Sequence, residues 1–131
     1  MGDLSKNFSA WEFECRCGCG TGAMAPEFIA RLQIMRDRRG GSITVRSGIR
    51  CPEYNAKVGG KSDSEHLPDP ETGLTEGADL GYSGSYCRHM MTWAAHIAFN
   101  RVGIADEFIH VGSRASKPQD VTWIYPKKGT K

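Results

Sequence analysis

The stretch that most constrains the fold is residues 45–66, VRSGIRCPEYNAKVGGKSDSEH. Its start completes a β-branched run, and we expect a short strand over residues 43–46. Pro52 can open a short helix, PEYNAKV, which the glycine pair at 59 and 60 would end. The stretch closes on His66. A strand, a short helix and a loop that carries a histidine are therefore expected in direct succession.

Longer helices and further strands are expected on both sides of this stretch. Residues 26–41, PEFIARLQIMRDRRGG, predict a helix, because Pro26 suits a first turn and apolar residues recur at helical spacing before the glycines. A second helix is expected over residues 84–100, with Ser85 as its N-cap. Strand-like runs follow the β pattern at 78–80, 107–111 and 121–125. The pattern predicts an α+β fold, with a small, mainly antiparallel sheet flanked by helices.

Length and composition indicate one globular domain. Of the 131 residues, 39% are hydrophobic and 24% are charged, which is typical of a folded domain. We expect a single domain over residues 1–131, with the Cys/Gly-rich segment 1–23 packed on it, and a monomer. Lys plus Arg exceed Asp plus Glu by only 17 to 15, so the charge indicates no nucleic-acid partner. No apolar run reaches the length of a membrane span, so we expect no membrane insertion.

Two histidines and an aspartate have the residue types of a zinc site. His66 lies in SEHLPDPETGLTEGADL, residues 64–80, Asp79 lies near the end of that run, and His110 lies late in DEFIHV. A catalytic zinc typically takes three protein ligands and leaves a fourth position for water. A carboxylate nearby, Glu107 or Asp106, could then accept a proton. Spacing alone leaves two interpretations open: a metal site, or a solvated loop.

The order of several short motifs resembles the zinc murein peptidases, which include D-alanyl-D-alanine carboxypeptidases and the L-alanyl-D-glutamate endopeptidases among bacteriophage endolysins. The pattern of that family is Ser-Gly-aromatic-Arg after a strand, an Asn, a Gly-Gly pair, Ser-x-His, a small residue before Asp, and Glu-x-x-His. The matching residues in this chain are Ser47, Gly48, Arg50, Asn55, Gly59, Gly60, Ser64, His66, Ala78, Asp79, Glu107 and His110. The resemblance covers most of the chain and implies the α+β fold that this family shares with the Hedgehog signalling domain.

The resemblance also implies roles for particular residues. It implies one catalytic zinc bound by the three residues His66, Asp79 and His110. It further implies that Glu107 is the general base, that Arg50 contacts the substrate near a scissile carbonyl or a terminal carboxylate, and that Ser64 belongs to the substrate site.

Two features of the chain qualify these assignments. Residues four apart on a regular strand share a face, so Asp106 competes with Glu107 as the base beside His110. The run between His66 and Asp79 is twice as long as is usual in the family. We therefore expect PDPETGLTE, residues 68–76, to be an inserted surface loop, whose closure entropy rises only slowly with length.

The implied function is zinc-dependent hydrolysis of a peptide bond in peptidoglycan stem peptides, of carboxypeptidase or endopeptidase type. The resemblance implies a bacteriophage or prophage lysis enzyme or a wall-remodelling enzyme. A non-catalytic metal-binding module of the same fold, with a structural or wall-binding role, is the alternative. Because MGDLSKNFSAWEFE lacks the features of a signal peptide, we expect synthesis in the cytoplasm, and action on the cell wall or periplasm after release through a phage-encoded pore.

Five cysteines, an odd number, cannot all pair within one chain; they are Cys15, Cys17, Cys19, Cys51 and Cys87. Alternate cysteines in CRCGCG would align on one side of an extended chain, and Cys51 could join them as the fourth ligand of a second, structural zinc. A disulfide to Cys51 and free thiols in a glycine-rich turn are the alternatives. Cys87 is expected to be a small buried hydrophobe on its helix.

Overall fold

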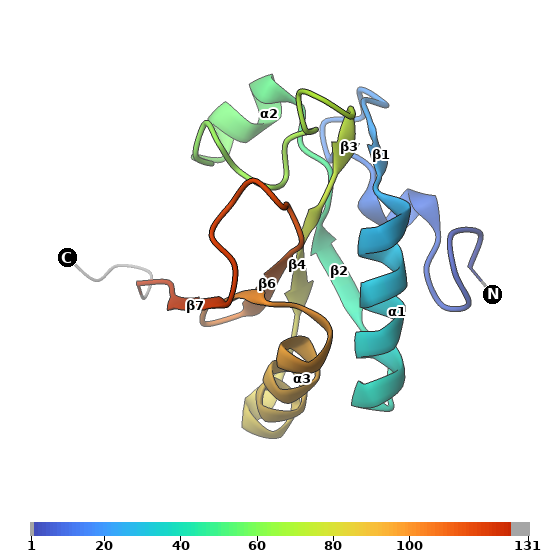
Figure 1. Cartoon of the computed structure of the whole chain (residues 1–131), viewed down its shortest axis with the longest axis vertical. Coiled ribbons are helices and arrows are strands. Elements are labelled where there is room, and N and C mark those ends of the chain that lie inside the picture. Colours follow the sequence, from blue (N-terminus) through green and yellow to red (C-terminus); the bar gives the residue numbers. More distant parts are fainter. Residues whose placement is uncertain (1, 127–131) are drawn as a thin grey trace.

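A five-stranded sheet and two long helices form the body of the molecule in the computed structural model, which describes residues 2–126 (Figure 1). The strand order is β2-β4-β6-β5-β7, and every neighbouring pair is antiparallel except the parallel pair β5 and β7. The predicted α+β class with a mainly antiparallel sheet is confirmed. The strands are β2 (Thr44–Ser47), β4 (Gly77–Gly81), β5 (Arg101–Ile104), β6 (Phe108–Gly112) and β7 (Val121–Ile124).

Helix α1 (Pro26–Arg39) begins and ends as its sequence predicts. Pro26 occupies the first turn, and Gly40 follows the last turn with a left-handed φ of 73°, which glycine adopts without steric cost. Phe28, Leu32 and Met35 are buried on one side of the helix. They join the core on the face of the sheet that α1 shares with helix α3 (Gly84–Ala98).

Helix α3 and the strand after it differ from the prediction. The N-cap is Ser83, in an extended conformation, and not Ser85. The helix ends at Ala98, because the next residue is already extended, and Arg101 then begins strand β5, which was not predicted. Cys87 is half-buried and not fully buried, and its sulfur accepts a hydrogen bond from Arg39 Nη2 at 3.6 Å.

The two faces of the sheet serve different purposes. In β4, Ala78 and Leu80 point into the core, as do Ile109 and Val111 in β6. Side chains alternate along a strand, so the residues between them point to the opposite face. Asp79 lies directly across from His110 in this antiparallel register. The sheet therefore presents these two polar side chains together, on the face away from the two long helices.

The N-terminal segment packs against strand β2 and the chain that follows it. The 3-10 helix η1 (Ala10–Phe13) buries Phe13, whose carbonyl accepts a hydrogen bond from Ile49 N at 2.8 Å. Gly48 makes this approach possible, because a Cβ there would collide with the backbone of Phe13. The glycine of the Ser-Gly motif is thus explained by a close backbone contact.

The prediction that residues 68–76 form a surface loop is partly wrong. Leu74–Thr75 form strand β3, which pairs in parallel with β1 (Ala23–Met24) of the N-terminal segment, and Thr75 is fully buried. Within this stretch only residues 70–73 are exposed, in a turn closed by the hydrogen bond from Gly73 N to Asp69 O. The inserted stretch is therefore tied to the fold at its C-terminal end.

Within residues 2–126, no helix combines the length and the apolar character needed to cross a membrane.

Candidate metal centre

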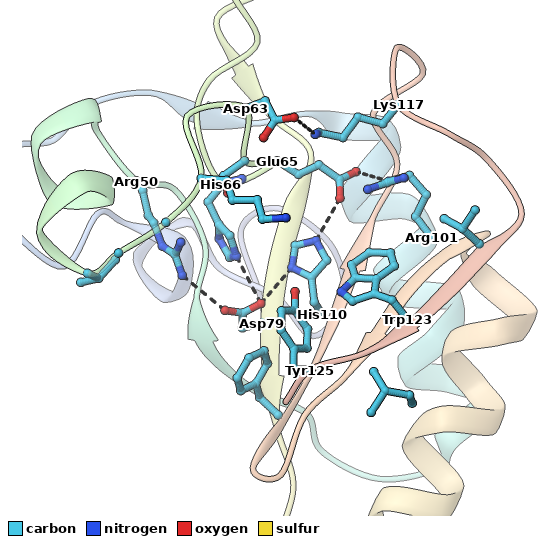
Figure 2. A pocket seen from close by; sticks show the side chains of 18 of the residues that line it. Arg50, Asp63, Glu65, His66, Asp79, Arg101, His110, Lys117, Trp123 and Tyr125 are labelled. Carbon is cyan, nitrogen blue, oxygen red and sulfur yellow. Dashed lines mark hydrogen bonds and ion pairs between the residues drawn. The ribbon is translucent and has the colours of Figure 1, made fainter. Parts of the chain in front are cut away.

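The three predicted ligands meet on the open face of the sheet (Figure 2). His66 comes from the loop after helix α2 (Pro52–Lys57), Asp79 from β4 and His110 from β6. Asp79 Oδ1 lies 3.2 Å from His66 Nε2 and 2.9 Å from His110 Nδ1. All three residues are buried, and one ligand atom from each lies within 4.8 Å of the others.

Hydrogen bonds on the far side of each ring leave both histidines ready to bind a cation. His66 Nδ1 lies 2.7 Å from the carbonyl oxygen of Gly48, and His110 Nε2 lies 3.0 Å from Glu65 Oε1. Because these partners only accept hydrogen bonds, those two nitrogens carry the ring protons. His66 Nε2 and His110 Nδ1 both lie against Asp79 Oδ1, and a metal ion bound there would take the lone pairs of these two nitrogens together with the Asp79 carboxylate. This set of donors fits a zinc ion.

Glu65, which none of the sequence motifs marks, forms the back of the site. It is only 3% exposed. Besides the bond from His110, its Oε2 accepts hydrogen bonds from Arg101 Nε at 2.9 Å and from the backbone N of Arg114 at 3.2 Å. A buried carboxylate that orients a metal-binding histidine in this way is a common supporting element of zinc sites.

The buried charges of the site perturb one another strongly. Burial raises the pKa of Asp79, but the hydrogen bonds with His110 and His66 outweigh it and hold that pKa well below its usual range. Burial likewise raises the pKa of Glu65, but the hydrogen bonds from His110 and Arg101 lower it to about 2. Burial lowers the pKa of His110, whereas its bonds to Asp79 and Glu65 raise it to about 9. Surroundings that hold a proton on a buried histidine also favour a bound cation.

Arg50 lies beside the three ligands and is held by the motif residues around it. Its Nη2 is 3.5 Å from Asp79 Oδ2, its Nε donates to Ser47 Oγ at 3.3 Å, and its Nη1 donates to Asn55 Oδ1 at 3.3 Å. Asn55 Nδ2 in turn donates to the carbonyl oxygen of Lys61 at 2.9 Å, and Gly60 leaves room for this amide, with which a Cβ would collide. Ser47, Asn55 and the second glycine of the Gly-Gly pair thus position this guanidinium.

A cleft of about 760 Å³ opens above the three ligands. Ser64, Lys61 and Lys117 lie along it, and Ser64 Oγ accepts a hydrogen bond from His66 N at 3.1 Å. Trp123 and Tyr125, within and just after β7, form an aromatic wall opposite Arg50 (Figure 2). The cleft therefore combines a metal-binding floor with cationic and aromatic sides.

Neither carboxylate that was considered as a base lines this cleft. Glu107 lies in the turn between β5 and β6, and its carboxylate is 3.8 Å from Arg46 Nη1 with 66% of the side chain exposed. Asp106 lies in the same turn and borders a separate hollow beside α3. Since β6 starts at Phe108, Asp106 is outside the strand and does not share a strand face with His110.

The four cysteines at positions 15, 17, 19 and 51 form a second cluster, with their sulfurs within 4.8 Å of one another. The segment that carries three of them is a series of turns, so the expected extended chain is wrong. Cys87 lies apart on α3.

The sequence comparisons agree with this geometry. The family model described as Peptidase M15 matches residues 6–112. The matched part contains the three ligands, Arg50 and the four clustered cysteines, whereas the aromatic wall after residue 120 lies beyond it. No curated protein matches the chain.

Proposed function

The chain belongs to the peptidase M15 family, and from this premise we propose that it hydrolyses a peptide bond in peptidoglycan stem peptides with zinc as its cofactor. The observation that carries the proposal is the convergence of His66, Asp79 and His110 on the floor of a cleft that also holds Arg50. The family is zinc-dependent and implies a substrate related to peptidoglycan. One chain supplies every residue of the proposed site, so we propose a monomer as the active unit.

The protein groups around the metal ligands support hydrolysis. A zinc ion bound there would polarise the scissile carbonyl and lower the pKa of a water molecule. Arg50 is fixed by Ser47 and Asn55, and its remaining donor capacity suits a substrate carboxylate or a developing oxyanion. Its side chain is 15% exposed, so a bound substrate can reach it from the cleft.

Glu107 is the general base that we propose, as the family pattern implies. Its carboxylate has to leave Arg46 to act in the cleft. Both side chains are largely exposed, at 66% and 48%, and a surface pair of this kind contributes only about 0–1 kcal/mol. Glu65 is a poor candidate in spite of its place in the site, because its two oxygens already accept hydrogen bonds from His110, Arg101 and the backbone N of Arg114.

The sides of the cleft suit a peptide that carries carboxylates. Lys61 and Lys117 lie along the cleft, and Lys117 Nζ is 3.2 Å from Oδ2 of the exposed Asp63, with which a substrate carboxylate could compete. Trp123 and Tyr125 offer apolar surface to the peptide side chains. The resemblance to endolysins leads us to propose phage or prophage lysis, or wall remodelling, as the setting of this activity.

The decisive experiment is incubation with purified peptidoglycan, followed by mass spectrometry of the new termini. Free D-alanine would identify a carboxypeptidase, and a new N-terminal D-glutamate would identify an L-alanyl-D-glutamate endopeptidase. His110→Ala is the matched inactive control. If the zinc-loaded protein produces no new termini, the proposal is wrong. The non-catalytic metal-binding module would then be favoured, consistent with the position of Glu107 outside the cleft.

A further inference from the structure

The four clustered cysteines bring two distant segments of the chain together. Cys15, Cys17 and Cys19 follow η1, whereas Cys51 is the N-cap of α2. The Sγ atoms of Cys15 and Cys17 are 3.4 Å apart, and those of Cys17 and Cys51 are 3.6 Å apart. Cys15 and Cys51 are buried, and the other two are exposed. The cluster therefore lies at the surface, with two of its cysteines buried and two exposed.

The spacing of the sulfurs fits a tetrahedral metal ion better than a disulfide. Four sulfurs at about 2.3 Å from a central zinc are about 3.8 Å from one another. The two measured separations are close to this value, and all four sulfurs fall within 4.8 Å. A disulfide would instead select one pair at about 2.05 Å and leave the other two sulfurs beside it without a role.

Backbone amides point at three of the sulfurs. Cys51 N donates to Cys15 Sγ, Tyr54 N donates to Cys51 Sγ and Thr21 N donates to Cys19 Sγ, each at 3.4 Å. Each of these three sulfurs therefore accepts a backbone hydrogen bond, which is how the surroundings support a sulfur that binds a metal. Thiolates are the form of cysteine that binds zinc.

Two glycines turn the chain so that alternate cysteines face one point. Gly18 and Gly20 follow Cys17 and Cys19 directly, and both have left-handed φ angles, of 83° and 72°. A hydrogen bond from Gly18 N to Cys15 O, at 3.0 Å, closes the first turn. Because left-handed backbone is readily accessible only to glycine, the CRCGCG pattern encodes this reversal.

We propose that Cys15, Cys17, Cys19 and Cys51 bind a second zinc ion, and that this ion is structural. Four protein ligands leave no coordination position for water, which distinguishes the cluster from the site of His66, Asp79 and His110. Cys51 directly follows Arg50. The ion therefore fastens the N-terminal segment to the chain next to the guanidinium that borders the cleft.

The test is metal analysis together with cobalt substitution of the whole chain. We expect two zinc ions per wild-type chain, one of which is lost in His66→Ala and the other in the double variant Cys17→Ser/Cys19→Ser. The Co²⁺-loaded protein should show thiolate-to-cobalt charge-transfer absorption, and His66→Ala should retain it. Cys87→Ser is the matched control and should keep both ions and the absorption.

One result for the wild-type protein overturns the proposal even if the double variant does not fold. That result is the absence of thiolate-to-cobalt absorption, together with either a disulfide in the intact mass or reaction of all the cysteines with a thiol reagent. The histidine site contains no sulfur, so its failure to bind metal would leave the cobalt absorption unchanged. A failure of the proposed peptidase site can therefore be told apart from a failure of the cysteine site.

Discussion

The carboxylate of Glu65 occupies the space beside Gly112 that any larger side chain would need. A Cβ on Gly112 would collide with both carboxylate oxygens of Glu65. Gly112 lies two residues after His110 on the same face of β6, so the missing side chain lets the carboxylate reach His110 Nε2 at 3.0 Å. The orientation of a predicted metal ligand thus depends on a pair of residues that lie far apart in the sequence.

Glu65→Gln should weaken zinc binding at the histidine site. The change preserves the shape but removes the charge that orients His110 and pairs with Arg101, and losses of this kind typically reduce metal affinity by about 10-fold to 100-fold. Competition with a chelator would measure the affinity. Asp63→Asn is the control, because Asp63 pairs with Lys117 at the edge of the cleft.

Gly112→Ala should weaken zinc binding as well, although it removes no charged group, because its methyl group would displace the Glu65 carboxylate. If Glu65→Gln and Gly112→Ala both bind zinc as tightly as Asp63→Asn does, Glu65 does not support the metal site.

The stability of the metal-free protein should depend on pH through the same contacts. The pKa of His110 is raised from 6.5 to about 9, so its contribution is complete below pH 6.5 and is lost as the pH rises through 9. The pKa of Glu65 is lowered from 4.5 to about 2, so its contribution is present above pH 4.5 and is lost as the pH falls toward 2. The free energy of unfolding should therefore be highest between these two ranges.

Denaturant unfolding in the presence of a chelator would measure this profile. The alkaline loss should be about 3 kcal/mol at most, from the shift of one buried group. Saturating zinc should abolish it, because a histidine that binds the metal carries no proton there to lose. His96→Gln, at an exposed position on α3, should retain the alkaline loss in the metal-free protein. An equal alkaline loss with and without zinc would contradict the assignment to His110.

The parts of the fold that follow local rules were predictable from the sequence. Helix α1 has a proline at its start, a glycine after its end and a regular apolar spacing, and the structure matches each signal. Strand β5 was missed because RVGI is short and only Phe99 and Asn100 separate it from α3, so the predicted helix was extended to residue 100. Strand β3 was missed because its partner, β1, is distant in sequence.

The candidate site likewise contains residues that could be predicted from the sequence and one that could not. Its three ligands could be named because their order and their neighbours form a known pattern, and the sheet register then places Asp79 across from His110. Glu65 could not be found by any pattern of spacing, because its role depends on space that Gly112 leaves on another strand. Its position next to His66 and the glycine two residues after His110 were the only available signals.

Arg50→Lys should reduce kcat/KM without loss of zinc. Lysine cannot reproduce the planar set of donors that contacts Ser47, Asn55 and Asp79 together. Removing a donor that stabilises a developing oxyanion typically costs about 100-fold to 1,000-fold in rate. Peptidoglycan digestion and metal analysis on the same preparation would measure both quantities. Arg88→Lys, on the exposed surface of α3, is the control, and equal activity of the two variants would leave Arg50 with a structural role alone.

The family pattern and the geometry of the structure differ on which residue is the general base. Glu107 is engaged with Arg46 at the surface, and Asp106 lies beside α3, so one of them has to reorient if either is to act. The Glu107 carboxylate can reorient at little cost, because the ion pair that it would break is exposed and weak. The backbone of the turn is held at both residues, because the carbonyl of Asp106 accepts a hydrogen bond from the Tyr82 hydroxyl at 2.6 Å and that of Glu107 accepts one from Arg46 Nη1 at 3.1 Å.

Glu107→Gln should therefore lower kcat by about 100-fold to 10,000-fold with zinc content unchanged, because general-base assistance is lost while the shape is preserved. Asp106→Asn should have little effect. Arg46→Ala removes the partner that holds Glu107 at the surface, so kcat should stay at or above the wild-type value. Peptidoglycan turnover by folded, zinc-loaded variants would rank the three. If Asp106→Asn is the most impaired, the base carried over from the family is wrong and the turn before β6 rearranges to deliver Asp106.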